Sequence, residues 1–175
     1  MKSILALLLL ICTQSALANV ETVLERLQAL AMAGDYEKAI EQNIAELVIA
    51  QDNPRLLNLL GEFRLETGDL DAAENQFKQV IDLSGANRLT ATMNLAKVYL
   101  RKGALQQAET LFHQIRSVYS SQLKPGAEDL FAIASATQYL GKYNPQLFKE
   151  AVQIYTEAQR VNPSSLDAQI ALGEL

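Results

Sequence analysis

Residues 56–77 read LLNLLGEFRLETGDLDAAENQF, and the same pattern returns at residues 90–112 as TATMNLAKVYLRKGALQQAETLF. In each segment a small residue stands seven positions before a glycine, an alanine five positions after it, and a phenylalanine four positions after the alanine. These positions are Gly61, Gly68, Ala73 and Phe77 in the first segment and Ala96, Gly103, Ala108 and Phe112 in the second. Apolar residues on both sides of each glycine recur at the spacing of amphipathic helices. Each segment therefore predicts a helix, a tight turn at the glycine and a second helix.

The turn glycine recurs along the chain. It is found at Gly34, Gly68, Gly103 and Gly141, at spacings of 34, 35 and 38 residues. A residue that ends a helix often needs a positive φ angle, which glycine adopts without steric cost. Asp35 and Asp69 follow two of these glycines, where the next helix needs an N-cap. Self-similarity at this period predicts an array of stacked helical units.

This period, with its small–Gly–Ala–aromatic spacing, resembles the tetratricopeptide repeat (TPR) family. The resemblance implies an all-α solenoid of helix-turn-helix units. Small residues let the two helices of a unit approach closely, and the aromatic residue fills the space against the next unit. About four repeats and the first helix of a fifth are implied. The expected bounds are 19–53, 54–88, 89–123 and 124–163 for the repeats and 164–175 for the partial fifth.

The first repeat, around LERLQALAMAGDYEKAIEQNIAEL at residues 24–47, departs from the pattern. Asn43 stands where the aromatic residue belongs. We expect Ile40, Ile44 and Leu47 to form the apolar face of that helix instead. Terminal repeats are commonly atypical because one of their faces meets solvent.

The fourth repeat carries an insertion. Gly141 and Ala151 are ten residues apart, against five residues in the other units, and the additional residues lie in KYNPQLFKE at residues 142–150. We expect Asn144 to cap the second helix of this unit and Pro145 to open it, because proline is favoured at the first helical position.

The last ten residues, LDAQIALGEL at 166–175, match the start of another first helix, with Gly173 in the place that Gly61 has in the second repeat. A helix that caps an array usually has a polar outer face, and this segment has little polar surface. We therefore expect an interrupted repeat, with a capping helix as the alternative.

The N-terminus has the three parts of a cleavable secretory signal. Lys2 supplies the positive charge, and the apolar run over residues 4–12 is much shorter than the roughly 20 residues of a membrane span. Residues 16–18, Ala-Leu-Ala, place small side chains at a signal-peptidase site. We therefore expect residues 1–18 to be removed and the chain to be exported, to a bacterial periplasm or the medium. A buried N-terminal helix and lipidation at Cys12 are the alternatives.

Composition argues against several classes of function. The net charge is −5 without a basic cluster, which is unfavourable for binding nucleic acid. The single cysteine lies within the expected signal, so disulfides and thiolate metal sites are not expected. His113 is the only histidine, and the sequence has no HExxH motif and no glycine-rich phosphate loop. We therefore expect no catalytic residues, cofactor or metal in these residues.

The resemblance also implies a function. In TPR proteins the first helices line a concave groove that usually holds a peptide or protein segment, which would make this chain a non-catalytic scaffold for protein binding. The implied groove residues are Asn58, Glu62, Met93, Lys97, Arg101, Phe131, Ser135 and Gln138. The basic pair that grips a C-terminal carboxylate in one TPR class is missing, and Glu62 would repel a carboxylate, so we expect another ligand. Tyr99, Tyr139 and Tyr155 have core-like helical spacing and are expected to pack.

The expected partner is a protein or peptide of unidentified sequence, with no nucleic acid and no membrane span once the signal is removed. Two other functions stay open. One is the N-terminal recruitment part of a larger secreted enzyme, such as a metallopeptidase whose catalytic domain is outside these residues. The other is a structural part of an envelope assembly. More repeats beyond Leu175 would favour the scaffold, and a domain with an HExxH motif would favour the enzyme.

Overall fold

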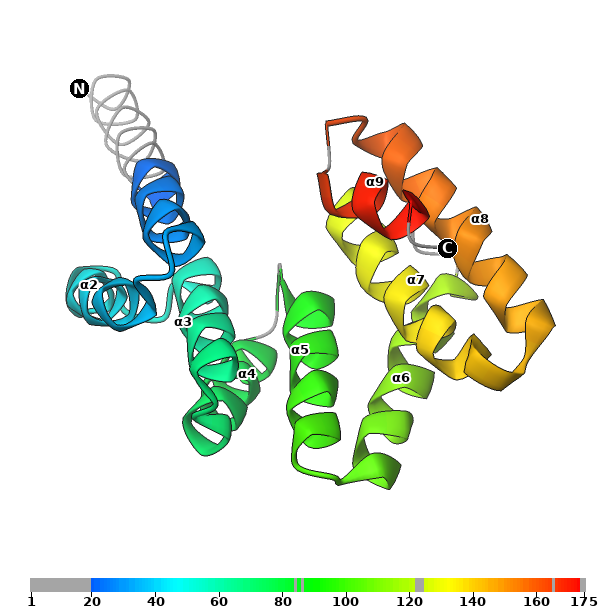
Figure 1. Cartoon of the computed structure of the whole chain (residues 1–175), viewed down its shortest axis with the longest axis horizontal. Helices are drawn as coiled ribbons and strands as arrows, with labels where there is room; N and C mark the ends of the chain where they lie inside the picture. The colour runs from blue at the N-terminus through cyan, green and yellow to red at the C-terminus, as the bar shows by residue number, and fades with distance from the viewer. Residues whose placement is uncertain (1–19, 84, 86, 122–124, 165, 174–175) are drawn as a thin grey trace, which may run out of the picture.

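The computed structural model describes residues 20–83, 85, 87–121, 125–164 and 166–173, and within them the chain is helical with no β-strand (Figure 1). This confirms the predicted all-α class. The expected signal, residues 1–18, lies outside the described residues. A helix over residues 20–32 is followed by α2 (Tyr36–Ile49), α3 (Pro54–Thr67), α4 (Leu70–Asp82), α5 (Arg88–Arg101), α6 (Leu105–Tyr119), α7 (Ala127–Leu140), the 3-10 turn η1 (Gly141–Tyr143), α8 (Pro145–Val161) and α9 (Leu166–Gly173).

The helices stack in chain order (Figure 1). Each helix from α3 to α8 packs against the helix before it and the helix after it. The first helices of neighbouring units also touch, α3 with α5 and α5 with α7. Buried side chains form two core clusters, one around Leu27, Leu56 and Phe63 and one that runs from Leu57 to Ala158, and Leu47 packs against both. Each unit is thus stabilised by its neighbours, as in other helical solenoids.

Three of the four turn glycines have the backbone conformation that the sequence predicts. Gly34, Gly68 and Gly103 have φ angles of +81°, +83° and +74°, in the left-handed region. Gly141 differs, because its φ of −77° is helical and the chain continues into η1. This glycine is needed for space instead: a Cβ atom on Gly141 would lie 2.7 Å from the backbone nitrogen of Phe148.

The helices α3 and α8 begin in the same way, with an asparagine cap followed by proline as the first helical residue. The side-chain oxygen of Asn53 accepts hydrogen bonds from the backbone N–H groups of Arg55 and Leu56 at 3.1 and 3.2 Å. Asn144 accepts the two corresponding bonds at the start of α8. The second helix of the fourth unit therefore begins where the sequence predicted, at Asn144 and Pro145.

The repeat positions of the second unit meet in one contact. Ala73 and Phe77 on α4 are fully buried, and the ring of Phe77 lies against Gly61 on α3. A Cβ atom on Gly61 would be only 2.6 Å from Cε1 of that ring. The small residue on the first helix therefore makes room for the aromatic ring of its own unit. The repeat spacing did not specify this contact, because the aromatic residue was expected to pack against the next unit. Ala91 and Ala96 on α5 belong to the same core cluster.

The first unit corrects one expectation. Ile44 does not belong to the apolar face of α2, because 44% of its surface is exposed. Asn43 is fully buried in its place, and its Nδ2 atom donates a 3.1 Å hydrogen bond to the backbone carbonyl of Leu56 on α3. Since successive helical residues are rotated by about 100°, burial of Asn43 turns the next side chain toward solvent.

A cluster of charged side chains joins α4 to the end of α5. The carboxylate of Glu74 accepts hydrogen bonds from Lys102 and from Lys78, each at 2.6 Å, and from the hydroxyl of Tyr99 at 3.3 Å. Only 18% of the Glu74 side chain is exposed. The bonds from Lys102 and Lys78 lower the pKa of the Glu74 carboxyl to about 2. The ionised form of Glu74 is therefore the one that the folded chain stabilises.

This lowered pKa predicts a pH-dependent contribution to stability. Because the pKa of Glu74 is lower in the folded chain than in the unfolded chain, its contribution is complete above the unfolded value and declines as the pH falls toward 2. We expect Glu74→Gln to lower the free energy of unfolding by about 2 kcal/mol at neutral pH and by roughly half of that near pH 3. Urea denaturation at both pH values measures this difference.

The matched control for this experiment is Glu41→Gln, on an exposed position of α2. We expect this variant to change the free energy of unfolding by less than about 0.5 kcal/mol at either pH. A Glu74→Gln effect that is equal at the two pH values would contradict the role assigned to the ionised carboxylate.

Candidate functional site

Two adjoining cavities lie along the first helices of the units. One encloses about 880 Å³ between the helix 20–32, α3 and α5, and the other encloses about 470 Å³ and reaches α7 and Asn162. They share the side chains of Gln28, Leu59, Glu62, Asn94 and Lys97. We call these two cavities together the groove. Its lining comes from four successive units, so any molecule that filled it would contact all of them.

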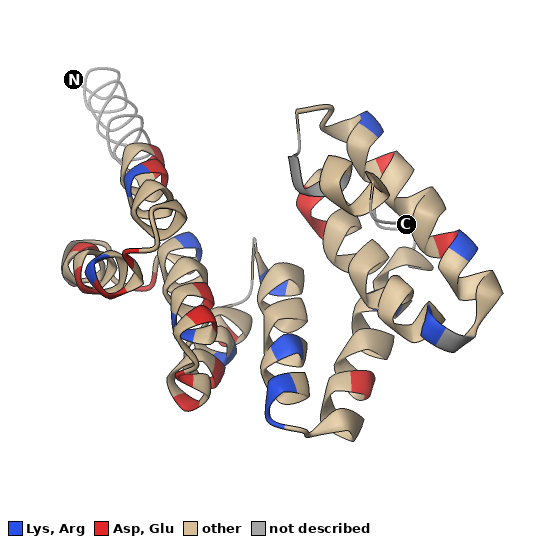
Figure 2. Ribbon diagram, in the orientation of Figure 1, with Lys and Arg blue, Asp and Glu red and all other residues tan. Residues whose placement is uncertain are grey.

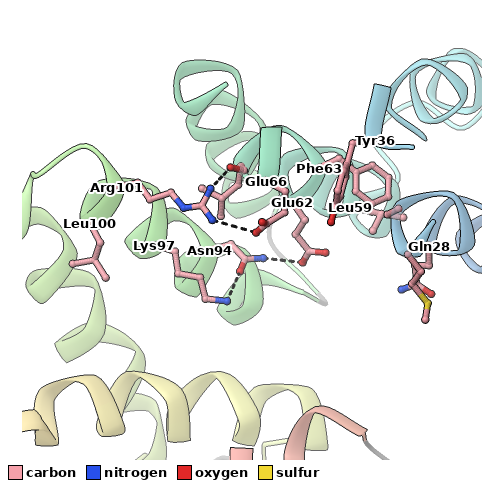
Figure 3. Close-up of a pocket in the computed structure, with 13 residues that line it drawn as sticks. Gln28, Tyr36, Leu59, Glu62, Phe63, Glu66, Asn94, Lys97, Leu100 and Arg101 are labelled. Atoms are coloured by element: carbon pink, nitrogen blue, oxygen red, sulfur yellow. Dashed lines mark hydrogen bonds and ion pairs between the residues drawn. The ribbon is translucent and has the colours of Figure 1, made fainter. Parts of the chain in front are cut away.

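A hydrogen-bonded network crosses the groove from α3 to α5 (Figure 3). Oε1 of Glu62 accepts bonds from Nδ2 of Asn58 at 2.7 Å and from Nδ2 of Asn94 at 2.8 Å. Oδ1 of Asn94 in turn accepts a 3.2 Å bond from the ammonium group of Lys97. Because Asn58 and Asn94 are buried, these bonds hold the Glu62 carboxylate and the Lys97 ammonium in defined positions.

The two arginines of the groove are occupied by partners within the chain. Arg55 binds both carboxylate oxygens of Glu21, at 2.5 and 3.2 Å, and these hydrogen bonds lower the pKa of the Glu21 carboxyl. Arg101 donates to the backbone carbonyl of Leu65 and, at 3.4 Å, to the carboxylate of Glu66. Both guanidinium groups therefore join the first helices of neighbouring units.

Lys97 differs from these arginines. It is exposed, its ammonium group bonds only to the Asn94 amide, and no carboxylate of the described residues lies within 4.0 Å of it. Its side chain lines both cavities of the groove and a third cavity beside them. Lys97 is thus a central cation of this surface that is free to pair with a ligand.

The third cavity, which we call the α5–α8 pocket, encloses about 540 Å³. It is lined by Met93, Lys97, Leu100, Phe112, Ser135, Gln138, Tyr139, Lys142, Phe148 and Tyr155. A chain of hydrogen bonds orders one wall: Ser135 Oγ lies 2.9 Å from the hydroxyl of Tyr155, which donates to Oε1 of Gln138 at 2.8 Å. The rings of Phe131 and Tyr155 meet edge to face, with centroids 5.6 Å apart.

The eight residues that the resemblance implied all line one of these cavities. Asn58, Glu62, Lys97, Arg101 and Phe131 line the groove, and Met93, Ser135 and Gln138 line the α5–α8 pocket, which Lys97 shares. Asn58 and Met93 are largely buried, so they form wall rather than contact surface. Whether these residues contact a ligand stays a prediction.

Sequence reasoning missed several lining residues. Tyr139 was expected in the core, yet 39% of its surface is exposed and its ring stacks on Phe112 with centroids 4.3 Å apart. Phe148 enters the α5–α8 pocket through the insertion of the fourth unit. Gln28 lies on the atypical first unit, where the repeat pattern is weakest. The insertion was a usable signal for Phe148, because it interrupts an otherwise regular array.

The described residues offer few groups for chemistry. They contain no group of three or more His, Cys, Asp or Glu side chains that are placed to hold a metal ion. The side chain of His113 is 60% exposed, and its Nε2 atom lies 3.9 Å from the carboxylate of Glu109 on the same helix. None of the described helices has the length and apolar character that crossing a bilayer requires.

The family model of the tetratricopeptide repeat matches residues 58–128, which run from Asn58 on α3 to the start of α7. Residues 58–128 therefore contain tetratricopeptide repeats. TPR arrays are scaffolds for protein–protein interaction, and the matched TPR units supply the Glu62 network and Lys97. Outside the match, the same alternation of helix, turn and helix continues on both sides. No protein with a curated description matches the sequence.

Several solved structures share the TPR fold at low sequence identity. A putative kinesin light chain from Podosopora anserina with nearly identical TPR-like repeats aligns with a TM-score of 0.59, at 17% identity over 89% of this chain and 92% of that chain. MamA from residue 41 onward, from Desulfovibrio magneticus RS-1, gives 0.52, at 17% identity over 88% and 81%. An O-GlcNAc transferase mutant from Thermobaculum terrenum gives 0.55, at 20% identity over 82% of this chain and 26% of that chain. These likenesses concern the fold alone.

Proposed function

We propose that this TPR chain is an exported, non-catalytic scaffold that holds a segment of a partner protein in its groove. The observation that carries the proposal is the shared lining of the groove, to which four successive units contribute. A surface built from several stacked units suits an extended ligand, which gains contacts from each unit that it crosses.

The network in the groove supports a ligand that brings polar groups. Glu62 and Lys97 present one acceptor and one donor of opposite charge, and buried amides hold both in place. Groups that are ordered before binding lose little conformational entropy when a ligand arrives. An extended peptide, with alternating donors and acceptors along its backbone, has the matching chemistry.

Selection from a random peptide library displayed on phage tests this function. We expect the full chain to enrich peptides over several rounds. We expect Gln28→Trp to reduce recovery of the enriched peptides by about tenfold, because the indole would project into the space where the two cavities meet. The control is Gln107→Trp, at an exposed position on α6 outside the groove, which should leave recovery unchanged. Equal recovery with both variants would contradict binding in the groove.

Export is the second part of the proposal and has its own test. Residues 1–18 have the charge, apolar run and small residues of a cleavable signal. Expression in a bacterium with a C-terminal tag should give a product in the periplasmic or extracellular fraction whose N-terminal sequence begins at Asn19. A product in the cytoplasmic fraction that begins at Met1 would contradict export.

A further inference from the structure

The α5–α8 pocket differs from the groove in the charge of its lining. Two lysines, Lys97 and Lys142, are among the ten described residues that line it, and none of the ten is acidic. The groove, in contrast, is lined by three acidic residues, Glu62, Glu66 and Glu128, as well as three basic ones, Arg55, Lys97 and Arg101. In a chain with a net charge of −5, the pocket is therefore a local excess of positive charge.

Two of the helices that line the pocket, α5 and α7, have no carboxylate beside it. Figure 2 shows positions of Lys and Arg in blue along the ribbon of α5, and none of Asp or Glu in red. The acidic residues of α7, Glu128 and Asp129, lie in its first turn, whereas Ser135 and Gln138 of the pocket lie two turns or more along the helix. No carboxylate of the described residues pairs with Lys97, so its charge is available to a ligand.

Two polar groups of the pocket, the Gln138 amide nitrogen and the Lys97 ammonium, can donate to a ligand, whereas the hydroxyl hydrogens of Ser135 and Tyr155 are used within the chain. The amide oxygen of Gln138 already accepts from Tyr155, which leaves its Nε2 hydrogens without another partner among the described residues. The hydroxyl of Ser135 donates to the backbone carbonyl of Phe131 at 2.9 Å. A ligand that satisfies Gln138 Nε2 and the Lys97 ammonium must supply acceptors, and a carboxylate is the acceptor that an ammonium binds best.

The rest of the lining is apolar and aromatic. Met93, Leu100, Phe112 and Phe148 surround the space, and Tyr139 lies at its exposed side, stacked on Phe112. The volume of about 540 Å³ falls within the usual range of ligand pockets. Aromatic walls favour an aromatic side chain, because offset and edge-to-face contacts between rings add to the free energy gained from burial.

We propose that the α5–α8 pocket is an anchor site for an acidic, aromatic segment of the partner protein. An aromatic side chain enters the pocket, and a carboxylate on an adjacent residue pairs with Lys97. The inference rests on the proposed function, because Lys97 lines both the pocket and the groove, so one peptide can occupy the two without a break. A free aromatic acid would fill the pocket but gain nothing from the groove.

Fluorescence anisotropy with four labelled peptides tests the anchor. Their sequences are GSGEFEGSG, GSGQFQGSG, GSGKFKGSG and GSGEAEGSG, and each is titrated with the full chain. We expect the Glu-Phe-Glu peptide to bind at least about tenfold more tightly than the Lys-Phe-Lys peptide and at least about fivefold more tightly than the Glu-Ala-Glu peptide. Equal affinity for the first and the third would overturn the proposed charge preference.

Three variants locate the binding. Lys97→Met should remove the preference for Glu-Phe-Glu over Gln-Phe-Gln while leaving the Gln-Phe-Gln affinity unchanged. Tyr139→Ala should weaken both peptides alike, because it removes an apolar wall and no charge. The control Lys149→Met, on an exposed position of α8 outside the pocket, should change neither. A Lys97→Met variant that keeps the parent's preference would overturn the pairing with Lys97.

Competition and library selection separate the remaining outcomes. In the competition experiment, unlabelled Glu-Phe-Glu peptide and N-acetylphenylalanine each compete with the labelled Glu-Phe-Glu peptide. If both displace it at the same concentration, the pocket is a small-molecule site and the inference is overturned. A second outcome is that the library yields peptides whose binding is lost in Gln28→Trp but whose sequences lack an acidic residue beside an aromatic one. That result would overturn the proposed anchor site and leave the proposed function standing. If the library yields no binder at all, the proposed function fails and the anchor fails with it.

Discussion

Phe77→Ala is expected to lower the free energy of unfolding by about 3–5 kcal/mol, the usual cost of truncating a fully buried phenylalanine. Phe77 has no exposed surface and belongs to the cluster that joins α4 to α5. Gly61, which the Phe77 ring contacts, has no side chain that could move into the space left behind. Urea denaturation followed by far-UV circular dichroism measures the change.

The control for this variant is Leu105→Ala, at a position of α6 that is mostly exposed, where we expect a change of less than about 0.5 kcal/mol. A double-mutant cycle with Gly61→Ala then tests the contact itself. In the parent the new methyl group would meet the Phe77 ring at 2.6 Å, whereas in Phe77→Ala it would fill part of the cavity. Additive effects of the two changes would contradict the packing of Phe77 on Gly61.

Gly141→Ala is expected to destabilise the fourth unit by about 1–3 kcal/mol, the range for overpacking a buried site. The substituted Cβ atom would meet the backbone of the next helix, at 2.7 Å from the nitrogen of Phe148 and 3.0 Å from its Cα atom. Backbone at the start of a helix cannot rotate away as a side chain can. Relief therefore requires movement of α8, which also displaces Phe148 in the α5–α8 pocket.

The matched control is Gly126→Ala, at the start of α7. Gly126 has a negative φ, and a Cβ atom there would meet no atom within 4 Å, so we expect a smaller loss of stability than for Gly141→Ala, from the poorer N-cap alone. Thermal unfolding of the two variants against the parent measures the difference. Equal melting temperatures for Gly141→Ala and the parent would show that the turn tolerates a side chain, in contradiction to the close approach described above.

Local sequence predicted the helices well because their causes are local. The spacing of Gly68, Ala73 and Phe77 predicted a turn followed by a helix with a buried face, and the structure contains both. Asn144 before a proline predicted the start of α8 despite the insertion. Capping and amphipathic periodicity depend on residues within about one or two turns of each other, so they can be identified from a single sequence.

The exceptions depend on contacts between distant residues. Ile44 was expected to be buried, but the contact of Asn43 with Leu56 on α3 decides the orientation of α2. Gly141 was expected in a left-handed turn, but the approach of Phe148 gives it another role. The sequence shows both departures from the repeat, Asn43 and the insertion after Gly141. Their structural consequences, however, depend on how neighbouring units pack.

The candidate site, too, was predictable from the sequence only in part. The amino-acid order alone specified a helix-turn-helix repeat, and the family resemblance identified first-helix positions that face one side, because a period of 3.6 residues assigns each position to a face. Only the stacked units brought Glu62 within 2.8 Å of Asn94, a residue 32 positions away, and paired Arg101 with Glu66, while no carboxylate of the described residues pairs with Lys97. Those pairings depend on the offset and rotation between neighbouring units, which arise from side-chain packing across the whole interface.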